Sequence, residues 1–211
     1  MSLPHVYQPI DINSPRGPLV VLEGVSAIGK TTLAQVLTER LGATGLHTLP
    51  LPHSGWSPVV NSQLRSLPQF AFYLSGVLHA SDSIRLCRSI GPVVADRYIS
   101  SVIACHAAVH RIEVATVIEL LEPFRSYLEI PTRTFYLRCS ESSLRERMAV
   151  KQDVRQDDTD LFAVPGRLAR LLANFEKVAA SDPSAVLVRT DDRTPDELAD
   201  WITAHLEADG A

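Results

Sequence analysis

The chain has 211 residues, of which 45% are hydrophobic, and this is enough to bury the core of one domain. Its formal net charge is −4 and no basic run occurs, so the sequence argues against a nucleic-acid partner. No apolar stretch is long enough to span a membrane, and residues 1–17 lack the apolar core of a signal peptide. We therefore expect a cytoplasmic enzyme whose cysteines, Cys87, Cys105 and Cys139, are reduced thiols.

Apolar segments of strand length alternate with longer amphipathic segments, which is typical of an α/β fold with a parallel sheet. Strands are predicted at 19–23, 46–49, 92–95, 134–138 and 185–189. Helices are predicted at 31–41, 69–88, 99–110, 112–121, 142–148, 166–180 and 195–206. We expect residues 1–17 to form a poorly ordered N-terminal extension and 18–208 to form a single domain.

Between the first strand and the first helix, the sequence Gly-Val-Ser-Ala-Ile-Gly-Lys-Thr matches the phosphate-binding loop pattern G-x-x-x-x-G-K-[ST]. Its glycines permit the backbone angles with which successive amides wrap an anion, and the helix start faces the phosphates. Lys30 is expected to face solvent or ligand and to reach the β- and γ-phosphates, while the Thr31 hydroxyl ligates Mg²⁺. The residues expected to bind the nucleotide are Gly24, Val25, Ser26, Ala27, Ile28, Gly29, Lys30, Thr31 and Thr32.

A second signal is Asp96, which ends the apolar strand predicted at 92–95. In phosphate-loop proteins such an acid supplies a second carboxylate to the Mg²⁺ site, so Thr31 and Asp96 are the predicted metal residues. The sequence contains neither Asn-Lys-x-Asp nor Asp-x-x-Gly, which argues against a GTPase switch.

Two further features have alternative interpretations. The charged segment 151–160 lies between two predicted helices, and its composition fits a solvated surface loop as well as a functional one. His106 and His110 have the spacing of metal ligands on a helix, but no H-E-x-x-H pattern or obvious third ligand accompanies them. We therefore favour His106 as a residue that lines an acceptor pocket.

Taken together, Leu-Glu-Gly ahead of the phosphate loop, the triplet Asp96-Arg97-Tyr98 and the arginines ahead of the polar segment resemble the thymidylate kinase and deoxynucleoside kinase group. The resemblance implies a P-loop NTPase fold with a five-stranded parallel sheet flanked by helices and an Arg-containing lid near 145–160. It also implies ATP and Mg²⁺ as cofactors. In addition, we expect a homodimer. The catalytic residues that it implies are Glu23, Lys30, Arg97, Arg145, Arg147 and Arg155.

Among these residues, Glu23 matches the carboxylate that such kinases place before the loop as the general base. Thymidylate kinases often carry a further acid inside the loop, where this chain has Ser26. The structural alternative for Glu23 is an acid at a strand end that is satisfied by backbone amides or by Arg97. The lid arginines have their own alternative as solvated surface charges.

The departures from thymidylate kinases concern the acceptor. Those enzymes tend to hold the acceptor's phosphate with arginines after the second strand and in the following long helix, but segments 49–53 and 72–77 contain none. Segment 52–56 instead resembles a deoxynucleoside kinase segment whose tryptophan lines the nucleoside pocket. The alternative is that Trp56 only fills space in the core or on the surface. The predicted substrate-binding residues are Trp56, Gln69, Tyr73, Arg97 and His106.

From these features we expect an ATP-dependent phosphotransferase that phosphorylates the 5′-hydroxyl of a nucleoside or a nucleoside-like small molecule. One alternative is a nucleoside monophosphate kinase of the thymidylate kinase type, which would take its phosphate contacts from Arg97 and other arginines. A regulatory or assembly ATPase without a small acceptor is an alternative from another class. No nucleic acid or membrane is expected among the partners.

Overall fold

The computed structural model describes residues 7–10, 12 and 17–208, so most of the predicted N-terminal extension lies outside the described residues. In the described part, five parallel strands form one sheet in the order β2-β3-β1-β4-β5. The strands are β1 (Leu19–Glu23), β2 (Thr44–His47), β3 (Val93–Asp96), β4 (Arg133–Arg138) and β5 (Ala185–Arg189). All five residues of β1 are buried, as expected for the central strand of a sheet that is covered on both faces.

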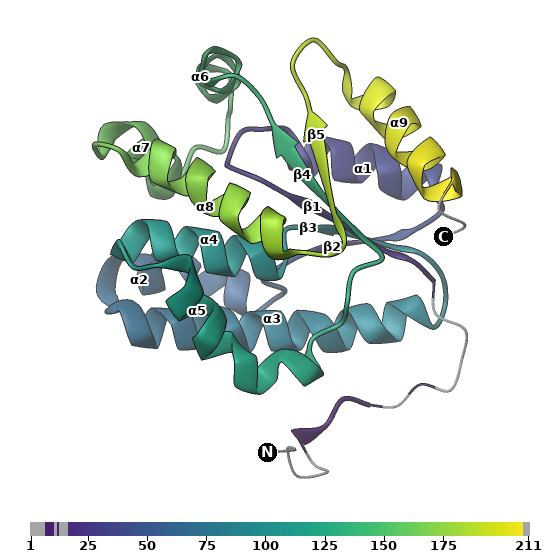
Figure 1. The fold of residues 1–211 in the computed structure, drawn as a ribbon, viewed down its shortest axis with the longest axis horizontal. Coiled ribbons are helices and arrows are strands. Elements are labelled where there is room, and N and C mark those ends of the chain that lie inside the picture. Colours follow the sequence, from purple (N-terminus) through teal and green to yellow (C-terminus); the bar gives the residue numbers. More distant parts are fainter. Residues whose placement is uncertain (1–6, 11, 13–16, 209–211) are drawn as a thin grey trace.

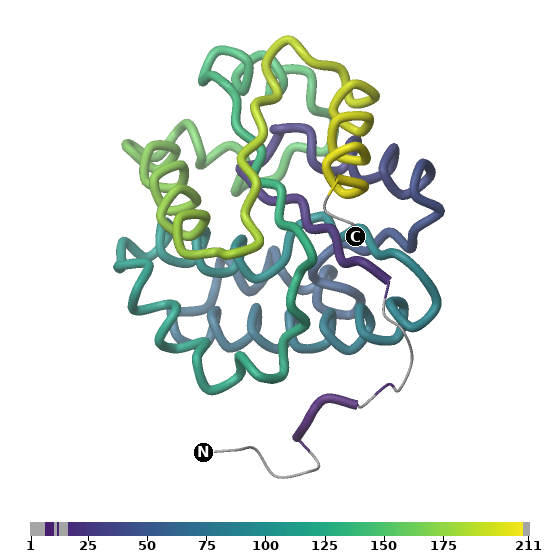
Figure 2. Tube along the Cα trace, turned by 45° about the vertical axis from the view of Figure 1, so that its right-hand side comes forward, coloured from purple at the N-terminus to yellow at the C-terminus, as the bar shows by residue number. Residues whose placement is uncertain are grey.

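Helices cover both faces of the sheet. α1 (Lys30–Arg40) and α9 (Pro195–Ala208) lie side by side on one face (Figures 1 and 2). On the other face, α3 (Ser66–Arg88), α4 (Ile99–His110), α5 (Val114–Leu121) and α8 (Arg167–Ser181) pack together. The remaining elements are α2 (His53–Gln63), which packs on α3, the 3₁₀ helix η2 (Glu122–Tyr127), α6 (Glu141–Ala149) and α7 (Gln156–Ala163).

The strand register brings the acidic residues at the ends of β1 and β3 to the carboxyl edge of the sheet. Leu22 of β1 pairs with Asp96 of β3, and Glu23 pairs with Tyr136 of β4. The chain leaves β1 for one side of the sheet and later returns to β4 on the other side. In such sheets the crevice at the carboxyl ends of the strands, where the order reverses, is the usual ligand site.

The predicted α/β fold with five parallel strands is confirmed, with small shifts of the strand bounds. β2 ends at His47 rather than at residue 49, because its ladder with β3 ends there and Leu49 has a positive φ of 81°. Among the described residues, two α-helices and the 3₁₀ helix η2 were not predicted. α2 contains Pro58, which is a turn signal in the sequence, and α7 begins inside the segment 151–160 that was interpreted as a loop.

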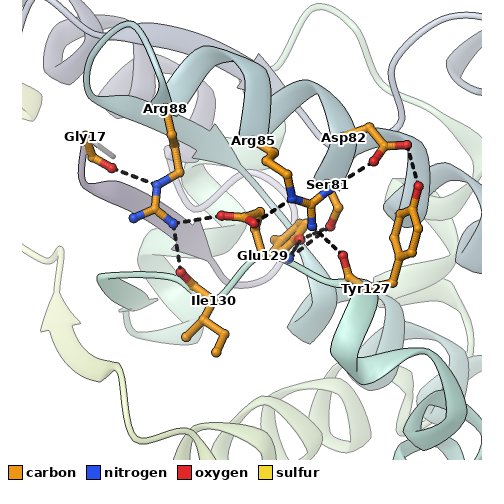
Figure 3. A network of polar contacts seen from close by, with 9 residues as sticks. Gly17, Ser81, Asp82, Arg85, Arg88, Tyr127, Glu129 and Ile130 are labelled. Atoms are coloured by element: carbon orange, nitrogen blue, oxygen red, sulfur yellow. Dashed lines mark hydrogen bonds and ion pairs between the residues drawn. The ribbon is translucent and has the colours of Figure 1, made fainter. Parts of the chain in front are cut away.

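At the far end of α3, a buried ion-pair network ties the helix to the segment before β4 (Figure 3). Arg85 donates to Oε1 of Glu129 at 2.9 Å, and Arg88 donates to Oε2 at 3.0 Å. Arg85 is 3% exposed and Glu129 is 5% exposed. The two charges compensate each other away from water, so this network joins α3 to the sheet.

All three cysteines are free, as predicted. Among the described residues, no helix combines the length and the apolar character that crossing a membrane requires.

Candidate active site

The phosphate loop joins β1 to α1 at the carboxyl edge of the sheet. Gly24 has a φ of 142°, and a Cβ there would lie 2.9 Å from the carbonyl oxygen of Leu137, so only glycine fits. Gly29 has a φ of 104° and caps the start of α1. The loop therefore has the strand–loop–helix setting in which backbone amides and a helix start hold a phosphate chain.

Lys30 is buried, with 5% of its surface exposed, so the expectation that it faces solvent is wrong. Its Nζ donates to the carbonyl oxygen of Val25 in the same loop at 2.6 Å. Burial and the positive charge of Arg97 lower the pKa of Lys30 to about 7, against the opposing effect of Asp96 and Glu23. A lysine that is desolvated in this way gains most from an incoming anion.

Thr31 and Asp96, the two predicted metal residues, are in contact. The Thr31 hydroxyl donates to Oδ2 of Asp96 at 2.6 Å. Oδ1 of Asp96 is buried without a hydrogen-bond partner, and the carboxylate is 4% exposed. His47, which the sequence did not single out, lies 3.6 Å from Oδ2 through its Nδ1. An oxygen pair with an unsatisfied carboxylate oxygen fits a hard divalent cation such as Mg²⁺.

Glu23 is fully buried, and both of its oxygens face the start of α4. Oε1 accepts hydrogen bonds from the backbone N–H groups of Tyr98 at 2.8 Å and Ser101 at 3.0 Å, while Oε2 accepts from the Ser101 hydroxyl. Burial raises the pKa of Glu23, although these hydrogen bonds and Arg97 oppose the increase. This arrangement matches the structural alternative, in which backbone amides satisfy an acid at a strand end, and the amides here belong to the start of a helix.

Arg97 lies between the phosphate loop and α4. It has a positive φ of 71°, and its Nη1 donates to the carbonyl oxygen of Gly24 at 3.3 Å and to the Ser101 hydroxyl at 3.2 Å. Its charge helps to lower the pKa of Lys30 and has a minor lowering effect on that of Tyr73 of α3. The guanidinium is therefore bonded to both the phosphate loop and the start of α4.

The three predicted lid arginines lie in different settings. Arg145 pairs with Glu141 one turn earlier on α6, and its guanidinium lies 4.6 Å from the centre of the Phe162 ring. Arg147 donates to the carbonyl oxygen of Ile28 at 2.8 Å and to the backbone and hydroxyl of Thr190, so it braces the phosphate loop against the end of β5. Arg155 is exposed and directly precedes α7.

A second group of polar side chains joins α2, α3 and α4 on the acceptor side. Oδ1 of Asn61 accepts from Nε2 of Gln69 at 2.9 Å and from the Tyr73 hydroxyl at 2.7 Å. His110 shares a hydrogen bond with Oε1 of Gln69, and Asn61 donates to Asp157 of α7 at 2.6 Å. Burial raises the pKa of Tyr73 to about 12, which keeps its hydroxyl neutral. We call Asn61, Gln69, Tyr73 and His110 the acceptor-side network.

His106 and Trp56 lie outside this network. The His106 ring is buried, with its centre 5.4 Å from the Phe70 ring and 4.5 Å from the His110 ring. Burial, with a smaller effect of His110, lowers the pKa of His106 to about 4, so this ring is neutral. Trp56 is 66% exposed on α2, which agrees with a surface position rather than an enclosed pocket.

The two segments without the expected arginines pack against each other. A Cβ at Gly76 would lie 2.4 Å from Cδ2 of Leu49 and 3.4 Å from the ring of His53. His53 in turn shares a hydrogen bond of 2.9 Å with Ser75. This part of α3 is therefore covered by apolar and neutral side chains instead of guanidinium groups.

Several residues of the site were missed because no motif marks them. Asn61 lies on a helix that was not predicted. Lys151 and Asp158 fall in the segment interpreted as a loop, yet Asp158 is buried against Ser26 of the phosphate loop. The sequence signal that could have revealed α7 is the pair of acids in its first turn, because carboxylates favour helix N-termini.

Comparison with known proteins agrees with this geometry. The family model described as thymidylate kinase matches residues 22–192. The chain is similar to the solved thymidylate kinase from Candida albicans, with a TM-score of 0.74 and 16% identity over 92% of this chain and 93% of that one. It is also similar to thymidylate kinase from Ehrlichia chaffeensis, with a TM-score of 0.63 and 17% identity over 91% of this chain and 100% of that one.

Among curated protein sequences, none matches this chain. The likeness to the two solved structures shows the fold, and the match of the family model extends over most of the chain. It includes the phosphate loop, Asp96, Arg97 and the acceptor-side network. The resemblance seen in the sequence is thereby confirmed: the chain is a P-loop nucleotide kinase that belongs to the thymidylate kinase family.

Proposed function

We propose that this kinase transfers the γ-phosphoryl group of ATP to the phosphate of a nucleoside monophosphate. The observation that carries the proposal is the position of Arg97, whose guanidinium donates to Gly24 of the phosphate loop and to Ser101 of α4, the helix that also carries His110. A cation between the donor loop and the acceptor-side network suits an acceptor that presents a phosphate to the donor. Family membership supports the same acceptor class, so the monophosphate alternative replaces the nucleoside as the favoured substrate.

On the donor side, the loop amides and Lys30 would hold the triphosphate. Thr31 and Asp96 would hold Mg²⁺, which when bound neutralises charge on the β- and γ-phosphates. Phosphoryl transfer of this type has a loose transition state, so the chain contributes mainly positioning and positive charge. Release of Lys30 from the Val25 carbonyl toward the phosphates is the rearrangement that this assignment requires.

On the acceptor side, the four residues of the acceptor-side network are neutral hydrogen-bonding groups beside the buried rings of Phe70 and His106. Flat apolar surface with a few convergent polar groups suits a nucleobase. The 145–160 segment, which includes the end of α6 and the start of α7, would close over ATP as the lid. A homodimer is part of the proposal.

A nucleoside with a free 5′-hydroxyl is the second candidate, and the packing of Leu49 on Gly76 favours it. That contact fills a place where a thymidylate kinase tends to carry an arginine for the acceptor's phosphate. An acceptor without a phosphate would not need the missing guanidinium groups.

A coupled assay of ADP release, run across nucleosides and their monophosphates with ATP and GTP as donors, separates these functions. We expect turnover with at least one monophosphate and little with the matching nucleoside. Turnover with nucleosides alone would make the nucleoside the favoured acceptor. ATP hydrolysis that no acceptor changes would favour the regulatory or assembly ATPase.

A further inference from the structure

A buried carboxylate from α7 lies against the phosphate loop. Oδ1 of Asp158 accepts a hydrogen bond from the Ser26 hydroxyl, and Oδ2 accepts from Nζ of Lys151 at 2.6 Å. Oδ2 also accepts from the backbone N–H of Arg155 at 3.0 Å, which caps α7. The side chain of Asp158 is 7% exposed and that of Lys151 is 20% exposed. We call Ser26, Lys151 and Asp158 the lid latch.

The charge of Asp158 conflicts with the chemistry of the loop that it touches. Burial raises the pKa of Asp158, but the hydrogen bonds from Lys151 and Ser26 outweigh burial, and the net shift is downward. The group is therefore a carboxylate at neutral pH. Since the loop is built to bind anions, an uncompensated carboxylate beside Ser26 would repel a triphosphate. Lys151 supplies the compensating charge.

The same geometry places the ammonium group of Lys151 close to the loop. One carboxylate group separates Nζ of Lys151 from Oγ of Ser26, because each bonds to a different oxygen of Asp158. Lysine is a point charge on a flexible stem, so it can exchange one anionic partner for another at small cost. Arg147 is held by three hydrogen bonds to the loop and to Thr190, and Arg145 pairs with Glu141 on its own helix. Lys151 donates to Asp158 and to the carbonyl oxygen of Asp153 at 2.9 Å, and it pairs with the exposed Asp153 carboxylate at 3.4 Å. Of these three cations, only Lys151 bonds to a carboxylate that itself contacts the loop.

We propose that Lys151 is the lid cation that meets the transferred phosphoryl group, and that Asp158 is the positioning residue that keeps it beside the phosphate loop. The inference rests on the proposed function only in taking a nucleoside triphosphate as the ligand of the loop. When the γ-phosphate enters, the ammonium shares its hydrogen bonds between Asp158 and a phosphate oxygen. The lid is thereby tied to the loop through the substrate.

The alternative is a purely structural ion pair that docks α7 on the loop. In that case loss of either partner would lower the melting temperature and leave the kcat of the folded enzyme unchanged. The two roles therefore predict different values of kcat and different effects on kcat and on KM. They also predict different effects of the double variant relative to the two single variants.

The test compares Lys151→Met, Asp158→Asn, the double variant and Lys151→Arg. Lys177→Met is the matched control, because Lys177 is 58% exposed and pairs only loosely with Glu113 at 3.4 Å. We expect Lys151→Met to lower kcat about 10²-fold, which is the cost of removing one charged or hydrogen-bonding group from a transition state. Lys151→Arg keeps the charge and should recover at least about a tenth of the kcat.

Asp158→Asn keeps the shape but loses the charge that positions Lys151. We expect its kcat to fall about tenfold while the KM for ATP stays level or decreases, because a repulsive carboxylate is gone. The double variant should match Lys151→Met within about twofold, since Asp158 acts through Lys151. A kcat within twofold of the wild type in Lys151→Met, or losses that multiply in the double variant, would overturn the proposal.

Binding of a nonhydrolysable ATP analogue and the melting temperature are measured on each preparation. Lys151→Met should weaken analogue binding about three- to tenfold, and Lys177→Met should leave it unchanged. These binding measurements need no acceptor, so they test the lid latch even if no nucleoside monophosphate is turned over. Unaltered analogue binding by folded Lys151→Met would contradict the proposal while leaving the proposed function in place.

Discussion

Thr31 at the start of α1 and Asp96 at the end of β3 are joined by a hydrogen bond of 2.6 Å, although 65 residues separate them in the chain. The parallel register of β1 and β3 creates this contact by placing Asp96 beside Leu22. One carboxylate oxygen of Asp96 is left buried and unsatisfied. The two oxygen groups are therefore adjacent, as the predicted Mg²⁺ site requires.

Asp96→Asn should weaken the binding of Mg²⁺, because the change removes a formal charge from the predicted metal site but keeps its shape. We expect the Mg²⁺ concentration at half-maximal rate to rise by about tenfold or more, which corresponds to about 1.4 kcal/mol. The measurement is a Mg²⁺ titration at saturating ATP. An unchanged titration would mean that Asp96 only orients Thr31 and His47.

Lys30 gives a prediction for the pH dependence of ATP binding. Its pKa of about 7 in the free protein should rise when phosphates arrive, so ATP binding takes up a proton above pH 7. Affinity should then fall by up to about tenfold per pH unit as pH increases above 7. Calorimetry at pH 8 in two buffers with different ionisation enthalpies measures this uptake.

Lys30→Met should abolish both phosphoryl transfer and the proton uptake. The fold should persist. In the unliganded variant, the part of the pH dependence of stability that comes from the titration of Lys30 should disappear. Since the folded pKa of about 7 lies below the ordinary 10.5, the unfolded chain binds more protons between these values, and wild-type stability rises with pH there. Wild-type binding without proton uptake at pH 8 would contradict the assignment of Lys30 as the phosphate-binding lysine.

Glu23→Gln should reduce stability more than catalysis. The carboxylate accepts three hydrogen bonds at the start of α4, two at Oε1 and one at Oε2. Glutamine keeps one acceptor oxygen, but its NH₂ group replaces the other, and the negative charge that faces the helix start is lost. We expect a loss of about 1–3 kcal/mol in the free energy of unfolding, with the kcat of the folded fraction within about threefold of the wild type. The general base predicted from the sequence would instead cost about 10²–10⁴ in kcat. Measuring melting, ATP affinity and kcat on one preparation separates the roles, and normal melting with a hundredfold slower kcat would restore the catalytic one.

Glu129→Gln should destabilise the protein through the network of Figure 3 without affecting the chemistry. The substitution removes the buried carboxylate from Arg85 and Arg88, and Asp82, at 3.0 Å, remains as the charged partner of Arg85. We expect a loss of about 3 kcal/mol. Glu113→Gln, at an exposed pair with Lys177, is the control and should change stability by less than about 0.5 kcal/mol. Denaturant unfolding measures both variants, and similar values for the two would show that the network does not stabilise the fold.

The sheet was predictable from sequence because its central strands are short apolar runs between clear turn signals. The bounds of β1 and β5 agree with the prediction, and the phosphate loop follows β1 as expected. α7 was not predictable by periodicity, since its first turn is almost wholly polar. The helix forms there because Asp158 caps it and its acids face the positive end of the helix dipole.

The donor half of the site was predictable because a local motif encodes it, whereas the other contacts depend on tertiary structure. Glu23 meets Ser101 across 78 residues, and Asn61 meets Tyr73 only because α2 packs on α3. No spacing in the sequence marks such pairs. The role of Lys151 was hidden for the same reason, since a lysine in a charged segment is indistinguishable from a surface charge until Asp158 is seen against Ser26.

Transfer of the labelled γ-phosphoryl group of ATP tests the central claim most directly. The enzyme is incubated with labelled ATP, Mg²⁺ and either a deoxynucleoside monophosphate or the matching nucleoside. The products are then separated and identified by mass spectrometry. The account predicts that a monophosphate gains one labelled phosphoryl group to become a diphosphate, and that Lys30→Met forms none. Label found only in inorganic phosphate, or only in a monophosphate made from a nucleoside, would contradict it.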